Sequence, residues 1–310
     1  MIETTYLITG GAGNIGSALV RKLAENELNK IVVVDNLSTG DINKIPDLPN
    51  VYHVDLDVNN YENLKATFED HDFDYVFHYA AVVGVKRTLE NPMMVLDDID
   101  GIKNVLSLSK DHKVKRVFFS SSSEVYGEPF EIPQNETTTP LNSRLPYAIV
   151  KNVGEAFFKS YHQEYGLNYT IFRFFNTYGP NQSEDFVVPR FLKAAMANEP
   201  IQIYGDGLQT RSFCYVDDNV DTCIAALKNE NYANDVLNVG SDIEITILEL
   251  AQTVIKVTDS DSPIVHLPAL KEGDMTRRCP DTTKMKNLLN RDLVPLETGL
   301  RKLIAFYENR

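Results

Sequence analysis

The feature that most constrains this chain is a glycine-rich segment, TGGAGNIG at residues 9–16, directly behind the short apolar run YLI. Apolar side chains recur at a helical period in the residues that follow, so the segment is predicted to turn a strand into a helix. At such a turn, free backbone N–H groups and the positive end of the helix favour a bound phosphate, above all the pyrophosphate of a dinucleotide. The candidate cofactor-binding residues here are Gly10, Gly13, Asn14, Ile15 and Gly16.

Short apolar runs alternate with longer helix-compatible stretches through the first half of the sequence. This alternation predicts βαβ units and a parallel sheet that is buried on both faces. We therefore expect an α/β fold with a Rossmann-type doubly wound sheet over residues 1–175, which also carries the catalytic residues, and a smaller, irregular part over residues 176–310. The expected strands lie at residues 6–8, 31–34, 75–77, 117–119 and 169–172, and the clearest helix at residues 147–165, ended by Gly166.

Composition limits the partners of this protein. Among 310 residues, 43% are hydrophobic and 24% charged, which is ordinary for a globular protein. No apolar run approaches the roughly 18 residues of a membrane helix, and the first residues do not resemble a signal peptide, so we expect a cytoplasmic protein without a membrane partner. A net charge of −14 disfavours nucleic acid, and three cysteines without metal-ligand spacing predict no metal site.

The second expected strand ends in an acidic residue, Asp35, which lies 19 residues after Gly16. In a dinucleotide-binding unit, a carboxylate at this place accepts hydrogen bonds from the adenosine ribose hydroxyls and repels a 2′-phosphate. The spacing therefore predicts NAD, rather than NADP, as the cofactor.

Three further residues form a candidate catalytic group. Ser122 follows an expected strand, and Tyr147 and Lys151 are four residues apart on one face of the expected helix. We expect the Lys151 ammonium and a nicotinamide cation to favour the phenolate, so that Tyr147 deprotonates a sugar hydroxyl while hydride leaves the same carbon. Ser122 would hold that hydroxyl in line, and Lys151 would also bind the nicotinamide ribose.

Together these segments resemble the extended short-chain dehydrogenase/reductases that act as nucleotide-sugar epimerases, dehydratases and decarboxylases. The likeness covers nearly the whole chain, from about residue 6 onward. Its further marks are DNLSTG at 35–40, HYAA at 78–81, SSSSEVYG at 120–127, RFFNTYGP at 173–180 and RSFCYVDD at 211–218.

The resemblance implies roles for residues that spacing alone does not reveal. It implies homodimers in which stretches such as 95–110 and 147–165 pair into a four-helix bundle. Further cofactor contacts are implied for Asn36, Ser38, Asp57, Val58, Ala80 and Ala81. Contacts to the diphosphate of a nucleotide-sugar substrate are implied for Asn176, the backbone around Val187 and Val188, Arg211 and Arg278.

Members of the family oxidise C4 of the sugar and differ in what the 4-keto intermediate then does. Ser123 and Glu124 are similar to the pattern of decarboxylases and some dehydratases, and Glu124 could move a proton on C5 or C6. Arg278, two residues before Pro280, also matches decarboxylases. Residues 271–274 (KEGD), followed by Asp281, are instead similar to 4-epimerases.

We therefore expect an NAD-dependent enzyme, with 4-epimerisation of a nucleotide sugar ranked first. Uronate decarboxylation and 4,6-dehydration remain close alternatives. A C4 dehydrogenase or 4-keto reductase with net redox change is a further alternative, and a noncatalytic NAD-sensing protein is a remote one.

One segment departs from the family. Residues 97–102 read DDIDGI where the family usually has NNVNGT, so amides that can donate hydrogen bonds are replaced by carboxylates that cannot. If Asp98 lies near the active site, its charge is expected to raise the pKa of Tyr147 or to disfavour a uronate.

Overall fold

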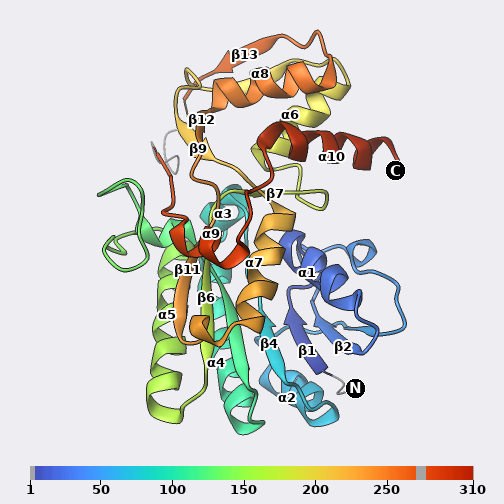
Figure 1. Cartoon of the computed structure of the whole chain (residues 1–310), viewed down its shortest axis with the longest axis vertical. Helices are drawn as coiled ribbons and strands as arrows, with labels where there is room; N and C mark the ends of the chain where they lie inside the picture. The colour runs from blue at the N-terminus through green and yellow to red at the C-terminus, as the bar shows by residue number, and fades with distance from the viewer. Residues whose placement is uncertain (1–3, 270–276, 310) are drawn as a thin grey trace.

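A seven-stranded parallel sheet forms the centre of the protein (Figure 1). The structure is a computed structural model that describes residues 4–269 and 277–309. The strand order is β11-β6-β5-β4-β1-β2-β3, with parallel pairing throughout. The strands are β1 (Thr4–Thr9), β2 (Asn29–Val34), β3 (Val51–Val54), β4 (Tyr75–His78), β5 (Arg116–Ser122), β6 (Tyr169–Phe174) and β11 (Asp235–Val239).

Side chains of the central strands alternate between two apolar cores, one on each face of the sheet. On β5, Phe118 faces one core and stacks on Phe77 of β4 with ring centroids 4.3 Å apart, while Val117 and Phe119 face the other. Burial on both faces explains why these strands are continuously apolar in sequence. Helices α1 (Asn14–Ala24) and α7 (Val216–Lys228) cover the first face, and α2 (Tyr61–Asp70), α4 (Pro92–Asp111) and α5 (Pro146–Tyr165) cover the second.

The remaining elements lie mostly beyond the carboxyl ends of the strands, in the upper part of Figure 1. Two-stranded pairs there are β7 with β10, β9 with β12, and β8 with β13. The helices are α3 (Val85–Glu90), α6 (Val187–Met196), α8 (Ile247–Thr258), α9 (Thr283–Leu289) and α10 (Leu296–Glu308), with 3-10 turns at Ile42–Lys44, Ser123–Tyr126 and Glu230–Tyr232. The short strands are β7 (Thr177–Tyr178), β8 (Ile201–Tyr204), β9 (Thr210–Ser212), β10 (Cys214–Tyr215), β12 (Glu244–Thr246) and β13 (Ile264–Leu267).

The predicted Rossmann-type fold is confirmed, and all five expected strands are present. Helix α5 ends as expected at Gly166, whose φ of 72° is the left-handed conformation that glycine tolerates. Strands β3 and β11 were not predicted. Because β11 pairs with β6, the second half of the chain completes the main sheet, and the division at residue 175 remains a prediction about function. In the described part of the chain, no helix is both long and apolar enough to cross a membrane.

A buried ion pair joins the central elements. Arg173 on β6 donates from Nε and Nη2 to the two carboxylate oxygens of Glu155 on α5, at 2.8 and 2.7 Å. Ser121 on β5 donates to the same carboxylate at 2.7 Å. Burial alone would raise the pKa of Glu155, but its hydrogen bonds with Arg173 and Ser121 outweigh that effect and hold the pKa below its ordinary value. The carboxylate is therefore charged and fully engaged.

This pair makes a testable prediction about stability. Arg173→Met leaves the Glu155 carboxylate buried without its cation, and we expect the free energy of unfolding to fall by about 3–5 kcal/mol. Lys159 contacts the same carboxylate at 3.6 Å from the solvent side, with 47% of its side chain exposed. For Lys159→Met we expect a loss below about 1 kcal/mol. Urea unfolding measures both variants, and losses of similar size would contradict the assignment.

Candidate active site

The predicted cofactor residues gather at the carboxyl ends of β1, β2 and β4. Gly10 follows β1 with φ of 73°, and a Cβ on it would lie 2.5 Å from the backbone nitrogen of Ala80. A Cβ on Gly16 would collide with the Gly10 carbonyl oxygen. Gly13 is the N-cap of α1 and makes no side-chain capping bond, and the buried Oδ1 of Asn14 has no hydrogen-bond partner. The turn therefore offers polar groups and a close approach, as a pyrophosphate requires.

The acidic residue at the end of β2 is rigidly held. Asp35 is 9% exposed and accepts hydrogen bonds from the backbone N–H groups of Ala12 and Leu37, both at 2.9 Å. The side chain of Asn36 accepts from the Ser38 N–H at 3.1 Å and donates to Asp57 at 3.2 Å. Four of the predicted cofactor residues thus form one continuous edge, with Asp35 beside the glycine turn, which fits the adenosine ribose of a dinucleotide.

The end of β4 closes the other side of this edge. Thr9 Oγ1 accepts the Ala80 N–H at 3.2 Å and hydrogen-bonds His78 Nδ1 at 2.8 Å. Burial lowers the pKa of His78 to about 3, so this imidazole is neutral and serves as a brace. Ala80 and Ala81 follow directly, while Val58, the last predicted cofactor residue, is buried beneath α4.

Ser122, Tyr147 and Lys151 come together where β5 meets α5. The Ser122 side chain acts on the Tyr147 phenol and lowers its pKa. The Lys151 Nζ lies 5.7 Å from the centroid of the Tyr147 ring and 3.4 Å from the Ser120 hydroxyl oxygen, and only 3% of this lysine is exposed. The structure therefore brings the predicted catalytic group together and adds Ser120, which sequence reasoning had treated only as part of a motif.

The ionisation of this group depends on burial and on neighbouring charges. Burial raises the pKa of Tyr147 well above its ordinary value, the charge of Glu124 raises it further, and the Ser122 hydrogen bond opposes both. Burial lowers the pKa of Lys151 to about 8, against the influence of Asp98. We expected the Lys151 ammonium to favour the phenolate. Lys151 is not among the main groups that act on the Tyr147 pKa, so help from the Lys151 ammonium stays a prediction, as does help from the positive charge of an oxidised nicotinamide.

Glu124 and Arg278 form an ion pair beside this group. Arg278 Nη2 lies 2.6 Å from Glu124 Oε1, and both side chains are largely buried, at 8% and 17% exposure. The second carboxylate oxygen of Glu124 is buried without a hydrogen-bond partner. Charges of both residues act on the Tyr147 pKa, Glu124 raising it and Arg278 lowering it. A predicted substrate residue thus contacts a predicted catalytic one, which neither motif alone could reveal. Ser123, the other catalytic candidate of this motif, is buried at the start of the same 3-10 turn.

The other predicted substrate residues lie beyond the sheet. Asn176 donates to the carbonyl oxygen of Ser212 at 3.1 Å, which holds its loop beside the strand that carries Arg211. Val187 and Val188 open α6, whose N-cap makes no side-chain capping bond. Val188 is buried in the core and Val187 packs against it, so a ligand would mainly meet the backbone of this segment. The residues 271–274 that favoured an epimerase lie outside the described residues.

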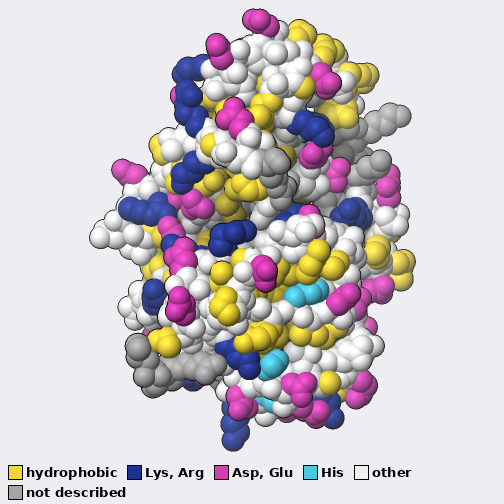
Figure 2. Space-filling model, turned by 90° about the vertical axis from the view of Figure 1, so that its right-hand side faces the viewer, with side chains coloured by type: hydrophobic (Ala, Val, Ile, Leu, Met, Phe, Trp, Pro, Cys, Tyr) yellow, Lys and Arg dark blue, Asp and Glu magenta, His cyan; other side chains and the backbone are white. Residues whose placement is uncertain are grey.

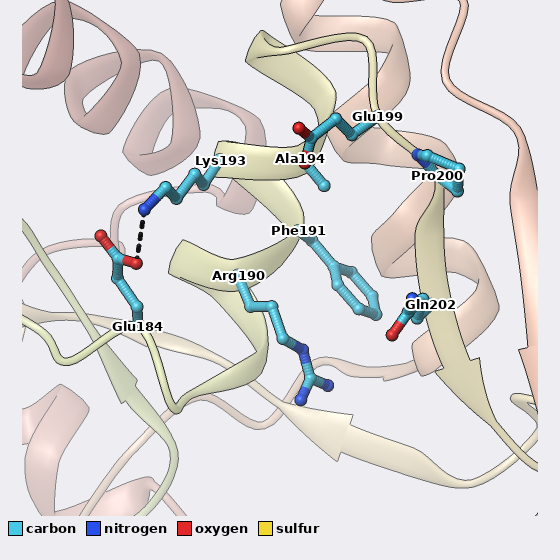
Figure 3. A pocket seen from close by; sticks show the side chains of 8 residues that line it. All are labelled: Glu184, Arg190, Phe191, Lys193, Ala194, Glu199, Pro200 and Gln202. Atoms are coloured by element: carbon cyan, nitrogen blue, oxygen red, sulfur yellow. Dashed lines mark hydrogen bonds and ion pairs between the residues drawn. The ribbon is translucent and has the colours of Figure 1, made fainter.

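A hollow of about 240 Å³ lies elsewhere, between α6 and β8 (Figure 3). None of the predicted site residues lines it, and its Lys193 is paired with Glu184 at 2.7 Å. Figure 2 shows acidic and basic side chains interspersed over one face of the molecule. The candidate active site therefore does not coincide with this hollow, and it is assigned from the residues gathered around Ser122, Tyr147 and Lys151.

The residues 6–240 match the model of the NAD dependent epimerase/dehydratase family. The chain belongs to this family. The protein is therefore an NAD-dependent enzyme, which confirms the cofactor predicted from the glycine turn and Asp35.

Relatives of the family match this chain from end to end. A UDP-N-acetyl-alpha-D-glucosaminuronate decarboxylase from Bacillus cytotoxicus is 35% identical, and the match covers 97% of each chain. The crystal structure of UDP-glucose 4-epimerase with UDP-glucose from Thermotoga maritima has a TM-score of 0.93 at 33% identity, covering 99% of both chains. A UDP-glucose 4-epimerase from Thermus thermophilus in complex with NAD has a TM-score of 0.91 at 28% identity, covering 98% and 99%.

The cofactor assignment of Asp35 can be tested by binding. Asp35→Asn presents an amide in place of a carboxylate that accepts two N–H groups, so one donor now faces another. We expect NAD affinity to fall about tenfold or more and discrimination against NADP to shrink. Calorimetry with each dinucleotide measures both effects. Asp47→Asn, an exposed carboxylate on the following loop, is the control. Unchanged affinity for NAD in Asp35→Asn would contradict the assignment.

Proposed function

We propose that this enzyme decarboxylates a nucleotide-activated hexuronic acid through a transient 4-keto sugar. The observation that carries this proposal is the buried Glu124–Arg278 ion pair at 2.6 Å, next to the Tyr147 phenol. Sequence analysis ranked 4-epimerisation first. The ion pair changes that order, because epimerisation of a neutral sugar requires no group that recognises a carboxylate, whereas the binding of a uronate does.

The common first step uses the Ser122, Tyr147 and Lys151 group. Ser122 orients the C4 hydroxyl, and Tyr147 accepts its proton as the C4–H bond breaks. Lys151 supplies a buried positive charge beside the phenol and can hold the ribose hydroxyls of the cofactor. Bound NAD would supply a hydride acceptor for C4 and would give the hydride back at the end, so that the overall reaction would be redox-neutral.

The second step follows from the position of the ketone. A C4 ketone is β to the carboxylate on C5, so the C5–C6 bond can break with release of carbon dioxide, and the electron pair passes to C5 and the C4 oxygen. Arg278 offers a guanidinium that can hold the carboxylate in place before the bond breaks. Glu124, with one oxygen unpartnered, can relay to C5 the proton that solvent then supplies.

We further propose that residues 1–175 hold NAD and the catalytic group, and that residues 176–310 mainly hold the nucleotide diphosphate. Arg211 is 8% exposed, and its guanidinium suits a diphosphate better than an ammonium would. Asn176 and the backbone at Val187 and Val188 would complete this site. We expect the activity to be cytoplasmic, since the three cysteines are buried free thiols.

The second candidate is 4-epimerisation of a nucleotide sugar. It is favoured by the similarity, over 99% of both chains, to a UDP-glucose 4-epimerase solved with UDP-glucose. Epimerisation would use the same first step and return hydride to the opposite face of the ketone. Dehydration would remove water across C5 and C6, with Glu124 moving a proton on C5 or C6. All three outcomes differ in product mass.

The deciding experiment incubates the NAD-loaded enzyme with UDP-, GDP- and dTDP-sugars, including uronic acids, and follows product mass and NADH absorbance. We expect a uronate to lose carbon dioxide without lasting NADH. For Arg278→Met we expect kcat/KM to fall about 100-fold or more, since a charge-assisted contact is lost. The neighbouring Arg277, 51% exposed and paired with Glu244, gives the control Arg277→Met, for which we expect a change below about twofold.

Each other outcome identifies a different reaction. A product of unchanged mass means epimerisation, and one lighter by water means dehydration. Accumulating NADH with a product two hydrogens lighter means a C4 dehydrogenase with net redox change. No turnover of any nucleotide sugar, with normal function of Tyr147→Phe in cells, would favour an NAD-sensing protein.

We also propose a homodimer formed through α4 and α5, which pack side by side. Large apolar side chains are exposed at the start of both helices: Met93 at 69%, Leu96 at 37% and Ile149 at 42%. A second copy of the same surface would bury them as a four-helix bundle. The interface would be apolar because these side chains are, and self-complementary because the same surface of each copy meets the other.

This proposal predicts a change of mass. We expect the wild-type chain to be dimeric at micromolar concentration and Ile149→Glu to be monomeric, because it buries a charge in the interface. Ile243 is the same residue type, is 68% exposed and lies outside both helices. The control variant Ile243→Glu should therefore remain dimeric. Light scattering after size exclusion gives the masses. A monomeric wild-type chain would refute the dimer.

A further inference from the structure

Asp98 links the cofactor edge to the catalytic group. It lies on α4, and its Oδ2 accepts the Val82 N–H at 2.8 Å. Val82 follows Ala80 and Ala81 in the loop after β4, where the predicted cofactor contacts lie. Helix α4 runs beside α5, which carries Tyr147 and Lys151 (Figure 1). The sequence departs from the family's usual amides at this place.

Helix α4 is held in position by contacts near the middle of its length. Asn104 donates to the carbonyl oxygens of Val58 and Asn59 at 3.0 and 3.1 Å. At Gly101 the helix lies very close to the segment after β3. A Cβ on this glycine would be 2.8 Å from the side chains of both Val58 and Asn59. Asp98 is therefore presented from a fixed helix, one turn before this contact, toward the loop after β4.

The Asp98 carboxylate raises the pKa of both Lys151 and Tyr147. Its charge favours the ammonium of Lys151, whose pKa burial has lowered to about 8. It disfavours the phenolate of Tyr147, whose pKa burial and Glu124 have already raised. Burial raises the pKa of Asp98 itself to about 6. The Val82 N–H and the charge of Lys151 lower this pKa, whereas the carboxylates of Asp57 and Asp97 raise it.

We propose that Asp98 is a positioning residue that sets the working pH range of the enzyme, by fixing the loop after β4 and placing one negative charge on the helix that packs against α5, which carries Tyr147 and Lys151. The proposal applies to any reaction that begins with removal of a hydroxyl proton by Tyr147. It therefore does not depend on whether decarboxylation or epimerisation follows.

Asp98→Asn isolates the charge, because an amide oxygen can still accept the Val82 N–H. The carboxylate raises the pKa of both Tyr147 and Lys151, so its removal lowers both. Activity requires Tyr147 able to accept a proton and Lys151 still charged. We therefore expect both limbs of the profile of kcat/KM against pH to move to lower pH, by about one unit. Below about pH 6, where Asp98 is itself protonated, the two enzymes should coincide.

The test uses any nucleotide sugar that the NAD-loaded enzyme converts, measured from pH 5 to 9.5 in about half-unit steps for wild type and three variants. Asp98→Glu retains the charge, and we expect its limbs to stay near those of wild type. Asp100→Asn removes an exposed carboxylate of the same helix that pairs with Lys103, and we expect no shift.

A second readout needs no substrate. Tyrosinate absorbance of the NAD-loaded protein is titrated with pH, and the Tyr147 signal is the difference between each protein and its Tyr147→Phe counterpart. We expect the midpoint to be lower in Asp98→Asn than in wild type. If Asp98→Asn reduces activity evenly at every pH, or if Asp100→Asn shifts the limbs equally, the proposal is wrong. An unshifted tyrosinate midpoint would overturn it whether or not the substrate is known.

Discussion

The arrangement of the candidate active site depends on one buried ion pair. Arg173 and Glu155 are 2% and 1% exposed, and such a pair is tolerated only where every remaining donor and acceptor is engaged. Here Arg173 also donates to the Tyr126 hydroxyl at 2.8 Å, and Ser121 donates to Glu155. The pair therefore fixes β5, β6, α5 and the turn after β5 relative to one another. Those four elements include every member of the catalytic group.

Helix α5 shows how this constraint reaches the reacting groups. Tyr147, Lys151 and Glu155 follow one another at intervals of four, so they lie along one face of the helix. Opposite them, Ser120, Ser121 and Ser122 end β5. Glu155 fixes the distance between helix and strand through Ser121, and this leaves Lys151 near Ser120 and Tyr147 near Ser122. The register of one helix on one strand thus positions the phenol, the ammonium and the hydroxyl together.

The sequence predicted the parts of this fold that repeat a local pattern. The central strands contain short apolar runs, and the glycine turn and Gly166 mark element ends, so these elements were predicted correctly. Strand β11 reads DVLNV and β3 reads VYHV, too short and too mixed to stand out from loops. Glu155 was missed because a glutamate in a helix ordinarily faces solvent. The contact between Glu124 and Arg278 depends on how distant segments return to the sheet, which no spacing encodes.

The return of that distant segment also explains how Arg278 is presented. Gln134 donates its backbone N–H to the Cys279 carbonyl at 2.8 Å and accepts the Asp281 N–H at 2.8 Å. Asn135 donates to the Asp281 carboxylate at 2.9 Å. The backbone on the carboxyl side of Arg278 is thereby fixed to the loop that follows Glu124.

With that backbone held, the side chain of Arg278 can exchange partners. Under the proposed function, a uronate carboxylate would draw the guanidinium from Glu124, and the charge of Glu124 beside Tyr147 would then be less compensated. Release of the carboxylate as carbon dioxide would restore the pair. Under this proposal, recognition of the substrate's charge and ionisation of the phenol would be coupled through the Arg278 guanidinium, which an epimerase acting on a neutral sugar would not require.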